Sequence, residues 1–152
     1  MRVKNKRILF VCTGNTCRSP MAEIILKSKL KNVGIKDVKV SSAGLMTEDG
    51  LKMSKNSFEA LKLMGYKPYG FKSKKLTEQM IYKSHAVICM TESHKNALSG
   101  YLNVYTISQI TGLENVIDPY GGNINTYIKT SHQIEDACNI LLNKILDDKE
   151  KN

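Results

Sequence analysis

The chain has 152 residues and is 41% hydrophobic, which suits a single domain over residues 1–152 with one core. No apolar run is long enough to span a membrane and the first residues do not resemble a secretory signal, so we expect a cytoplasmic protein without a membrane partner. The net charge of +9 suggests nucleic acid, an acidic surface or an acidic protein as partner, but dispersed lysines without interleaved aromatics favour a solvated basic surface and no nucleic acid.

Strands and helices alternate in the predicted elements. Apolar or β-branched runs predict strands, and apolar residues spaced three or four apart predict helices. In chain order we expect a strand over 7–11, a helix over 20–33, a strand over 38–42, a helix over 54–64, a short helix over 77–82, a strand over 85–90, a helix over 91–100, a strand over 103–107 and a helix over 126–146, followed by a solvated tail over 147–152. The expected N-caps are Ser19, Ser54, Thr77 and Thr91.

This alternation is typical of an α/β fold with a doubly wound parallel sheet of four strands and helices on both faces. Such sheets bind ligands beyond the carboxyl ends of their strands, where the strand order reverses. The segment after the first strand is therefore the first candidate for a functional site.

Residues 12–18 join the first strand to the first helix. Gly14 and Asn15 tolerate left-handed backbone angles, so this loop can turn successive N–H groups toward one point. Such a nest above a helix N-terminus attracts anions and favours the thiolate of Cys12, while Arg18 adds a planar fork for two phosphate oxygens. We interpret the segment as a phosphate-binding loop with Cys12 as its nucleophile. Its other expected phosphate-binding residues are Thr13, Gly14, Asn15, Thr16 and Cys17.

The alternative is that these residues are purely structural. Cys-x5-Arg also arises by chance, and a cysteine at the end of a buried strand is often a small core residue. Arg18 favours the chemical interpretation, because it is one of only three arginines in a lysine-rich chain and stands where a bidentate fork is useful.

Residues 11–23, VCTGNTCRSPMAE, resemble the signature of the low-molecular-weight protein tyrosine phosphatases. Asp118-Pro119-Tyr120 resembles the general-acid loop of that family, and similarity at residues 42–44, 59–61 and 90–91 extends the resemblance over nearly the whole chain. Within the family, Thr16 and the two glycines after Tyr120 make the chain most similar to the bacterial protein arginine phosphatases. The resemblance implies the strand order 2-1-3-4.

The resemblance also implies roles for particular residues. Cys12 would attack the phosphorus and form a phosphocysteine, Arg18 would bind the phosphoryl group, and Asp118 would act as general acid and then as general base. Tyr120 would form a flat wall beside the substrate. Without the loop, Asp118 before a proline would be interpreted as a turn former.

The resemblance also implies that Asn15, Ser19 and Ser42 hold the loop by hydrogen bonds, as the matching residues do in the family. Their structural interpretations are a turn residue, a helix cap and a strand end. The family often has a histidine where this chain has Phe71, so one partner of the network is expected to be missing.

Thr16 bears on the substrate, since tyrosine-directed members usually have a large aliphatic residue at this position. A threonine leaves room and offers a hydroxyl that accepts a hydrogen bond from a guanidinium. Residues 45–49, which by the resemblance form the other side of the mouth, lack an aromatic. We therefore expect phosphoarginine on proteins as substrate and inorganic phosphate as product, with phosphotyrosine as the alternative.

Other classes fit less well. An arsenate reductase of this type needs a further cysteine pair, and mid-chain there is only Cys89 in a predicted strand. A non-catalytic phosphate-binding module would not need both Cys12 and Asp118. No Cys-x-x-Cys or His cluster indicates a metal, and no cofactor is expected. Cys17 either traps oxidised Cys12 as a disulfide or is a small buried residue.

Overall fold

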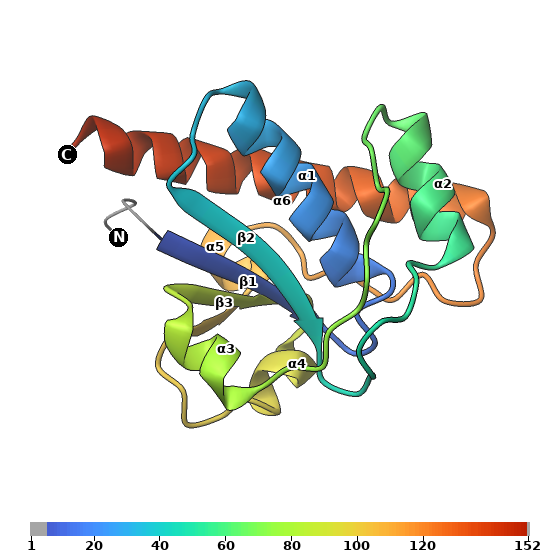
Figure 1. The fold of residues 1–152 in the computed structure, drawn as a ribbon, viewed down its shortest axis with the longest axis horizontal. Coiled ribbons are helices and arrows are strands. Elements are labelled where there is room, and N and C mark those ends of the chain that lie inside the picture. The colour runs from blue at the N-terminus through green and yellow to red at the C-terminus, as the bar shows by residue number, and fades with distance from the viewer. Residues whose placement is uncertain (1–5, 152) are drawn as a thin grey trace.

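Four parallel strands form one sheet in the order β2-β1-β3-β4 in the computed structural model, which describes residues 6–151 (Figure 1). The strands are β1 (Lys6–Cys12), β2 (Val38–Gly44), β3 (Ala86–Cys89) and β4 (Val104–Thr106). The helices are α1 (Arg18–Asn32), α2 (Lys55–Leu63), α3 (Glu78–Lys83), α4 (Glu92–Asn96), α5 (Ile107–Thr111) and α6 (Ile124–Glu150). The parallel sheet and its strand order confirm the predicted fold.

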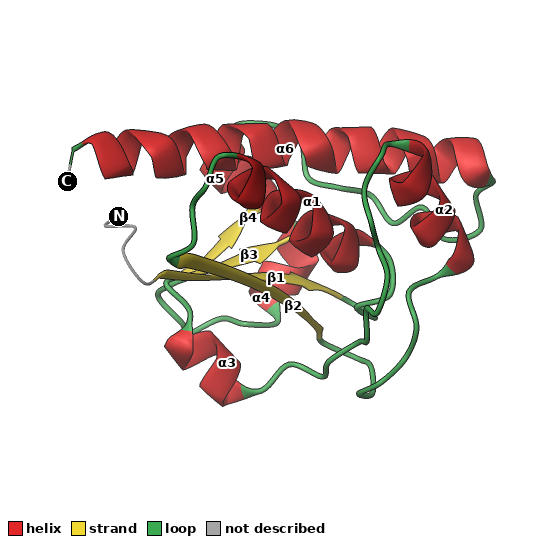
Figure 2. Ribbon diagram, turned by 45° about the horizontal axis from the view of Figure 1, so that its top comes forward, coloured by secondary structure: helices red, strands yellow, loops and turns green. Residues whose placement is uncertain are grey.

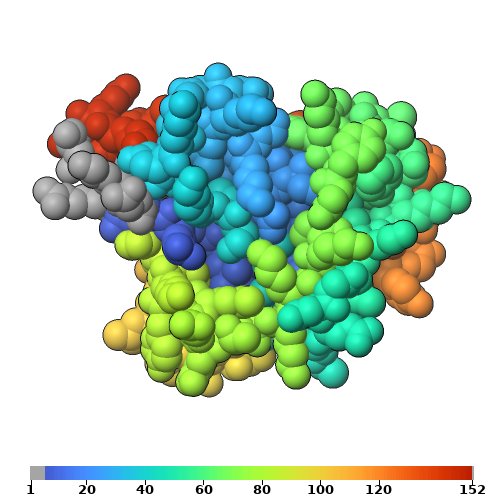
Figure 3. All heavy atoms as spheres, in the orientation of Figure 1, coloured from blue at the N-terminus to red at the C-terminus, as the bar shows by residue number. Residues whose placement is uncertain are grey.

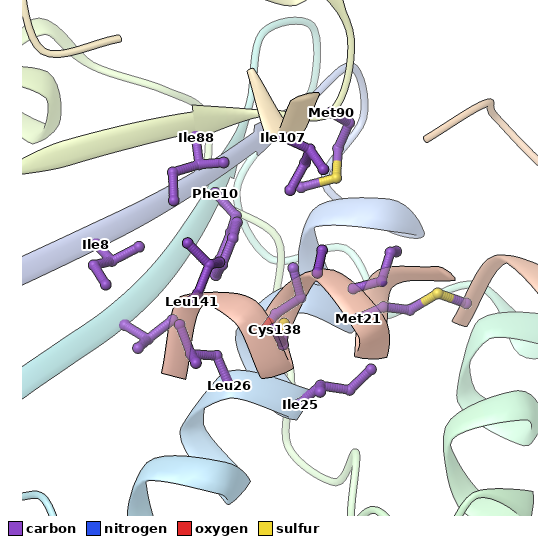
Figure 4. Close-up of a cluster of buried hydrophobic side chains, with 14 of the residues drawn as sticks. Ile8, Phe10, Met21, Ile25, Leu26, Ile88, Met90, Ile107, Cys138 and Leu141 are labelled. Carbon is purple, nitrogen blue, oxygen red and sulfur yellow. Dashed lines mark hydrogen bonds between the residues drawn. The ribbon is translucent and has the colours of Figure 1, made fainter. Parts of the chain in front are cut away.

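Helices cover both faces of this sheet. Figure 2 shows α1 and α6 above the strands and α3 below them. Side chains of β1 alternate accordingly, because Ile8 and Phe10 pack into the cluster on the α1 and α6 side, whereas Leu9 and Val11 pack into the cluster on the α3 side. Figure 4 shows the larger cluster, with side chains from β1, β3, α1, α5 and α6 meeting in one core.

The beginning of α1 differs from the prediction. The helix starts at Arg18, so Ser19 lies inside its first turn and is not the N-cap. Cys17 occupies the cap position without a side-chain cap hydrogen bond. The sequence signal of serine before proline was misleading because the Ser19 hydroxyl is engaged elsewhere, with Cys12 and Asn15. The caps predicted at Ser54, Thr77 and Thr91 are confirmed.

Three other elements differ from the prediction: the end of β2, the end of α6 and the short helix α5. β2 continues to Gly44, which pairs with Cys12 and forms a bridge with Lys75. The predicted tail is mostly helical because α6 continues to Glu150, while Asn152 lies outside the described residues. The short helix α5 was not predicted, although Thr106 and Gln109 form a capping box at its start. No helix within residues 6–151 is long and apolar enough to cross a membrane.

Candidate active site

The loop over residues 12–18 lies where the order of the strands reverses, since β1 has β2 on one side and β3 on the other. Cys12 ends β1 and Arg18 begins α1. The Cys12 side chain is buried, and its Sγ lies 2.9 Å from the Ser19 Oγ. The structure thus brings both ends of the Cys-x5-Arg motif to the edge of the sheet where the fold favours a ligand.

Asn15 fixes the shape of the loop from inside. It is fully buried and has a φ of 53°, the left-handed conformation expected there, which Gly14 does not adopt. Its Nδ2 donates to the hydroxyl oxygens of Ser19 and Ser42 at 2.8 and 2.9 Å. Its Oδ1 accepts from the Lys74 backbone N–H at 2.9 Å. The expected hydrogen-bonded network is therefore present around Asn15.

Phe71, at the position where the family often has a histidine, does not belong to the hydrogen-bonded network around Asn15. Phe71 packs against the hydrophobic core, and the backbone three residues later supplies the donor to Asn15. One partner of Asn15 is thus a main-chain group, and such a partner cannot be recognised from the identity of the residues.

Glu23, which belongs to the signature over residues 11–23 but was not predicted as a site residue, extends this network to the surface. Its Oε1 accepts from the Ser42 Oγ at 2.7 Å, and its Oε2 accepts from the Lys27 Nζ at 2.8 Å. The residue lines a groove of about 580 Å³ between α1 and residues 65–71. Figure 3 shows these two segments side by side on one face of the molecule.

The carbonyl groups and the N–H groups of the loop backbone differ in their hydrogen-bond partners. Three carbonyls are held by neighbouring amides: those of Cys12, Thr13 and Thr16 accept from the N–H groups of Leu45, Met46 and Ser54 at 3.0, 2.9 and 2.8 Å. Within the described part of the chain, by contrast, the N–H groups of residues 13–17 donate to no protein group. A run of N–H groups without partners beside a helix N-terminus is the arrangement that binds an anion.

Arg18 and Asp118 meet at the other side of the loop. The Arg18 side chain is buried, and its Nη1 donates to the Val116 carbonyl at 3.0 Å. Its Nη2 lies 3.7 Å from Asp118 Oδ2, and the Asp118 side chain is 53% exposed. Asp118 Oδ1 accepts from the Tyr120 N–H at 3.0 Å, while the Tyr120 side chain is exposed. The Val116 carbonyl, which orients Arg18, has no signal in the sequence.

Thr16 and Cys17 complete the predicted set. No protein group within residues 6–151 is hydrogen-bonded to the Thr16 hydroxyl.

Cys17 is partly buried, and burial raises its pKa to about 12, although a hydrogen bond with Ser57 lowers the pKa in part. Cys17 is therefore a thiol at neutral pH, and its disulfide with Cys12 stays a prediction. Residues 6–151 contain no group of three His, Cys, Asp or Glu side chains that could hold a metal ion.

His94 was not singled out by the sequence, yet it touches the loop. The ring is buried, with Nε2 2.9 Å from the Thr13 Oγ1 and Nδ1 3.1 Å from the Thr91 Oγ1. Burial, together with the smaller effect of the Arg18 charge, lowers its pKa to about 4, while Asp118 acts in the opposite direction. His94 is thus neutral at physiological pH.

Comparison with known proteins identifies the family of the chain. Residues 7–151 match the model of the low molecular weight phosphotyrosine protein phosphatases. The chain belongs to this family. It is a low molecular weight, cysteine-based protein phosphatase, and its relatives imply phosphorylated proteins as substrates.

Relatives within the family carry two different names. The chain is 34% identical to the protein-arginine-phosphatase of Bacillus subtilis, with 93% of this chain and 98% of that protein covered. It is 36% identical to the low molecular weight protein-tyrosine-phosphatase PtpB of Staphylococcus haemolyticus, with coverages of 84% and 91%. A solved structure of the YwlE arginine phosphatase, a cysteine-to-serine mutant with a phosphorylated active site serine, superimposes with a TM-score of 0.88 at 33% identity over 96% of this chain and 99% of that one.

The absence of a side chain at Gly44 is a requirement of this site. A Cβ at this position would lie 2.8 Å from the Thr13 carbonyl oxygen and 3.0 Å from the Asn15 Cβ. We expect Gly44→Ala to destabilise the protein by about 1–3 kcal/mol and to lower kcat, because the alanine displaces the loop. Urea unfolding and steady-state kinetics measure both effects. Ser41→Ala in the same strand is the control, and equal effects of the two variants would contradict the prediction.

Proposed function

We propose that this protein hydrolyses phosphoarginine on proteins through a phosphocysteine at Cys12. The observation that carries the proposal is the run of N–H groups over residues 13–17 without protein partners, with Cys12 before it and Arg18 after it. A phosphoryl group offers oxygens to these donors and to the Arg18 fork, and it presents its phosphorus to the thiolate at the base of the loop.

In the first step, the Cys12 thiolate attacks the phosphorus in line with the leaving nitrogen. The P–N bond breaks, its electron pair moves to the guanidine nitrogen, and protonated Asp118 supplies the proton that this nitrogen needs. The Ser19 hydroxyl, 2.9 Å from Cys12 Sγ, stabilises the thiolate by donating to it. The loop N–H groups and Arg18 stabilise the charge on the three non-bridging oxygens.

In the second step, a water attacks the phosphorus of the phosphocysteine. The Asp118 carboxylate takes a proton from this water, the S–P bond breaks, and its electron pair returns to Cys12 as the thiolate. Inorganic phosphate is the product. The phosphorylated serine in the mutant arginine phosphatase supports a covalent intermediate at this position.

The choice between phosphoarginine and phosphotyrosine rests on Thr16. Both activities occur in the names of relatives at similar identity, so overall similarity does not decide between them. The Thr16 hydroxyl has no protein partner in the described chain and is available to a guanidinium N–H. The exposed Tyr120 ring can stack on a guanidinium, but it would also stack on a tyrosine ring. Phosphotyrosine is the second candidate substrate.

Replacing Cys12 tests the covalent step. We expect Cys12→Ser to abolish turnover and to retain phosphopeptide binding, since the loop donors and Arg18 remain. Activity assays, together with calorimetric titration of the variant, measure the two properties. Hydrolysis that persists in Cys12→Ser would rule out Cys12 as the nucleophile.

Replacing Asp118 tests proton transfer. Asp118→Asn should lower kcat by about 10²–10⁴-fold with a much smaller change in KM, because an amide cannot give or take the proton in the transition state. The loss should be smaller for a substrate whose leaving group needs no proton. A variant with wild-type kcat would assign the acid role to another group.

Substitution of Thr16 tests the substrate. We expect the wild type to prefer a phosphoarginine peptide to a matched phosphotyrosine peptide by about 10⁴-fold in kcat/KM, as for sites that hydrogen-bond their substrate. Thr16→Val, of the same shape but without the hydroxyl, should reduce this preference, and Thr16→Ile should shift it toward phosphotyrosine. A wild type that prefers phosphotyrosine, with little change in Thr16→Ile, would establish the second candidate instead.

A further inference from the structure

His94 reaches the loop from α4, the helix that follows the neighbouring strand β3. β3 pairs with β1 as far as Val11 and Cys89, so the residues after β3 lie beside those after β1. Thr91 is the N-cap of α4 and accepts the His94 N–H, which places the imidazole over this first turn. The ring then joins Thr91 on its own helix to Thr13 in the loop, at 3.1 and 2.9 Å.

Thr13 is consequently held on two sides. Its carbonyl accepts from the Met46 N–H after β2, and its hydroxyl is bonded to His94 after β3. Thr13 directly follows Cys12, and its N–H is the first in the run without a protein partner. A rotation of this peptide would redirect that donor and move the neighbouring nucleophile.

We propose that His94 is a positioning residue of the phosphatase reaction, acting through the Thr13 hydroxyl to fix the peptide that follows Cys12. The inference rests on the proposed use of this loop for phosphoryl transfer, but not on which phosphorylated side chain is the substrate. The two threonines leave no ring nitrogen of His94 for the substrate, so the residue acts without contacting it. Its neutral ring provides one donor and one acceptor, and each threonine hydroxyl can take either part.

Two substitutions separate the contacts of the ring. In side-chain reach, glutamine places its amide near the position of Nε2, whereas asparagine places its amide near that of Nδ1. His94→Gln therefore retains the contact with Thr13, and His94→Asn retains the contact with the cap residue Thr91. If the role of His94 were limited to folding, the two variants would have similar activities at temperatures equally far below their thermal midpoints. A role through Thr13 makes their activities differ under this condition.

The experiment measures kcat and KM with p-nitrophenyl phosphate, together with the thermal midpoint of each variant. We expect His94→Asn to lower kcat about tenfold with KM nearly unchanged, and His94→Gln to stay within about twofold of the wild type. Thr13→Val should lower kcat as His94→Asn does. The double variant Thr13→Val/His94→Asn should be no slower than either single variant, because both changes break the same contact. His132→Asn, at an exposed position of α6, is the control.

The outcomes are distinct. Losses in the double variant that multiply, or equal activities of His94→Asn and His94→Gln, would overturn the positioning role while the proposed function stands. A wild type that hydrolyses phosphotyrosine rather than phosphoarginine would overturn the substrate proposal and leave the inference about His94 intact. A wild type without activity on any phosphate ester or phosphoarginine would overturn both.

Discussion

The site depends on the hydrogen bonds of one buried side-chain amide, that of Asn15. A non-glycine residue with a φ of 53° needs compensation, and here all the compensating bonds come from one side chain. Its contacts with Ser19, Ser42 and the Lys74 amide tie the loop to α1, to β2 and to the segment before α3. Because this amide is excluded from solvent, each unmet bond would cost about 1–3 kcal/mol, so the loop has one strongly preferred shape.

Backbone hydrogen bonds connect the opposite side of the site in a short series. The Met90 N–H donates to the Val11 carbonyl at 3.1 Å, and the Val116 N–H donates to the Met90 carbonyl at 2.9 Å. The Val116 carbonyl then accepts from Arg18 at 3.0 Å. The strand that ends at Cys12, the proposed nucleophile, thus also determines, through two neighbouring segments, where the Arg18 guanidinium lies. This rigidity suits a reaction whose charge is stabilised by donors already in place.

The parts that the sequence predicted well are those governed by local rules. Apolar runs located the strands, and single capping residues such as Thr91 located helix starts, because each depends on a few adjacent residues. The position of Ser19 inside α1, the Lys74 amide that binds Asn15, and the bond between His94 and Thr13 depend on residues far apart in the chain. A pattern in one sequence does not carry those distances, and the resemblance to a family supplied roles but not main-chain partners.

The N–H groups of residues 13–17 have a consequence for the folded state as a whole. Donors that have no protein acceptor bind water or an oxyanion, and whatever binds only the folded chain stabilises it by mass action. Inorganic phosphate would therefore protect the protein against unfolding and, by the same contacts, occupy the position that the next substrate needs. Resistance to unfolding in the presence of phosphate and inhibition by phosphate would then both follow from one binding equilibrium.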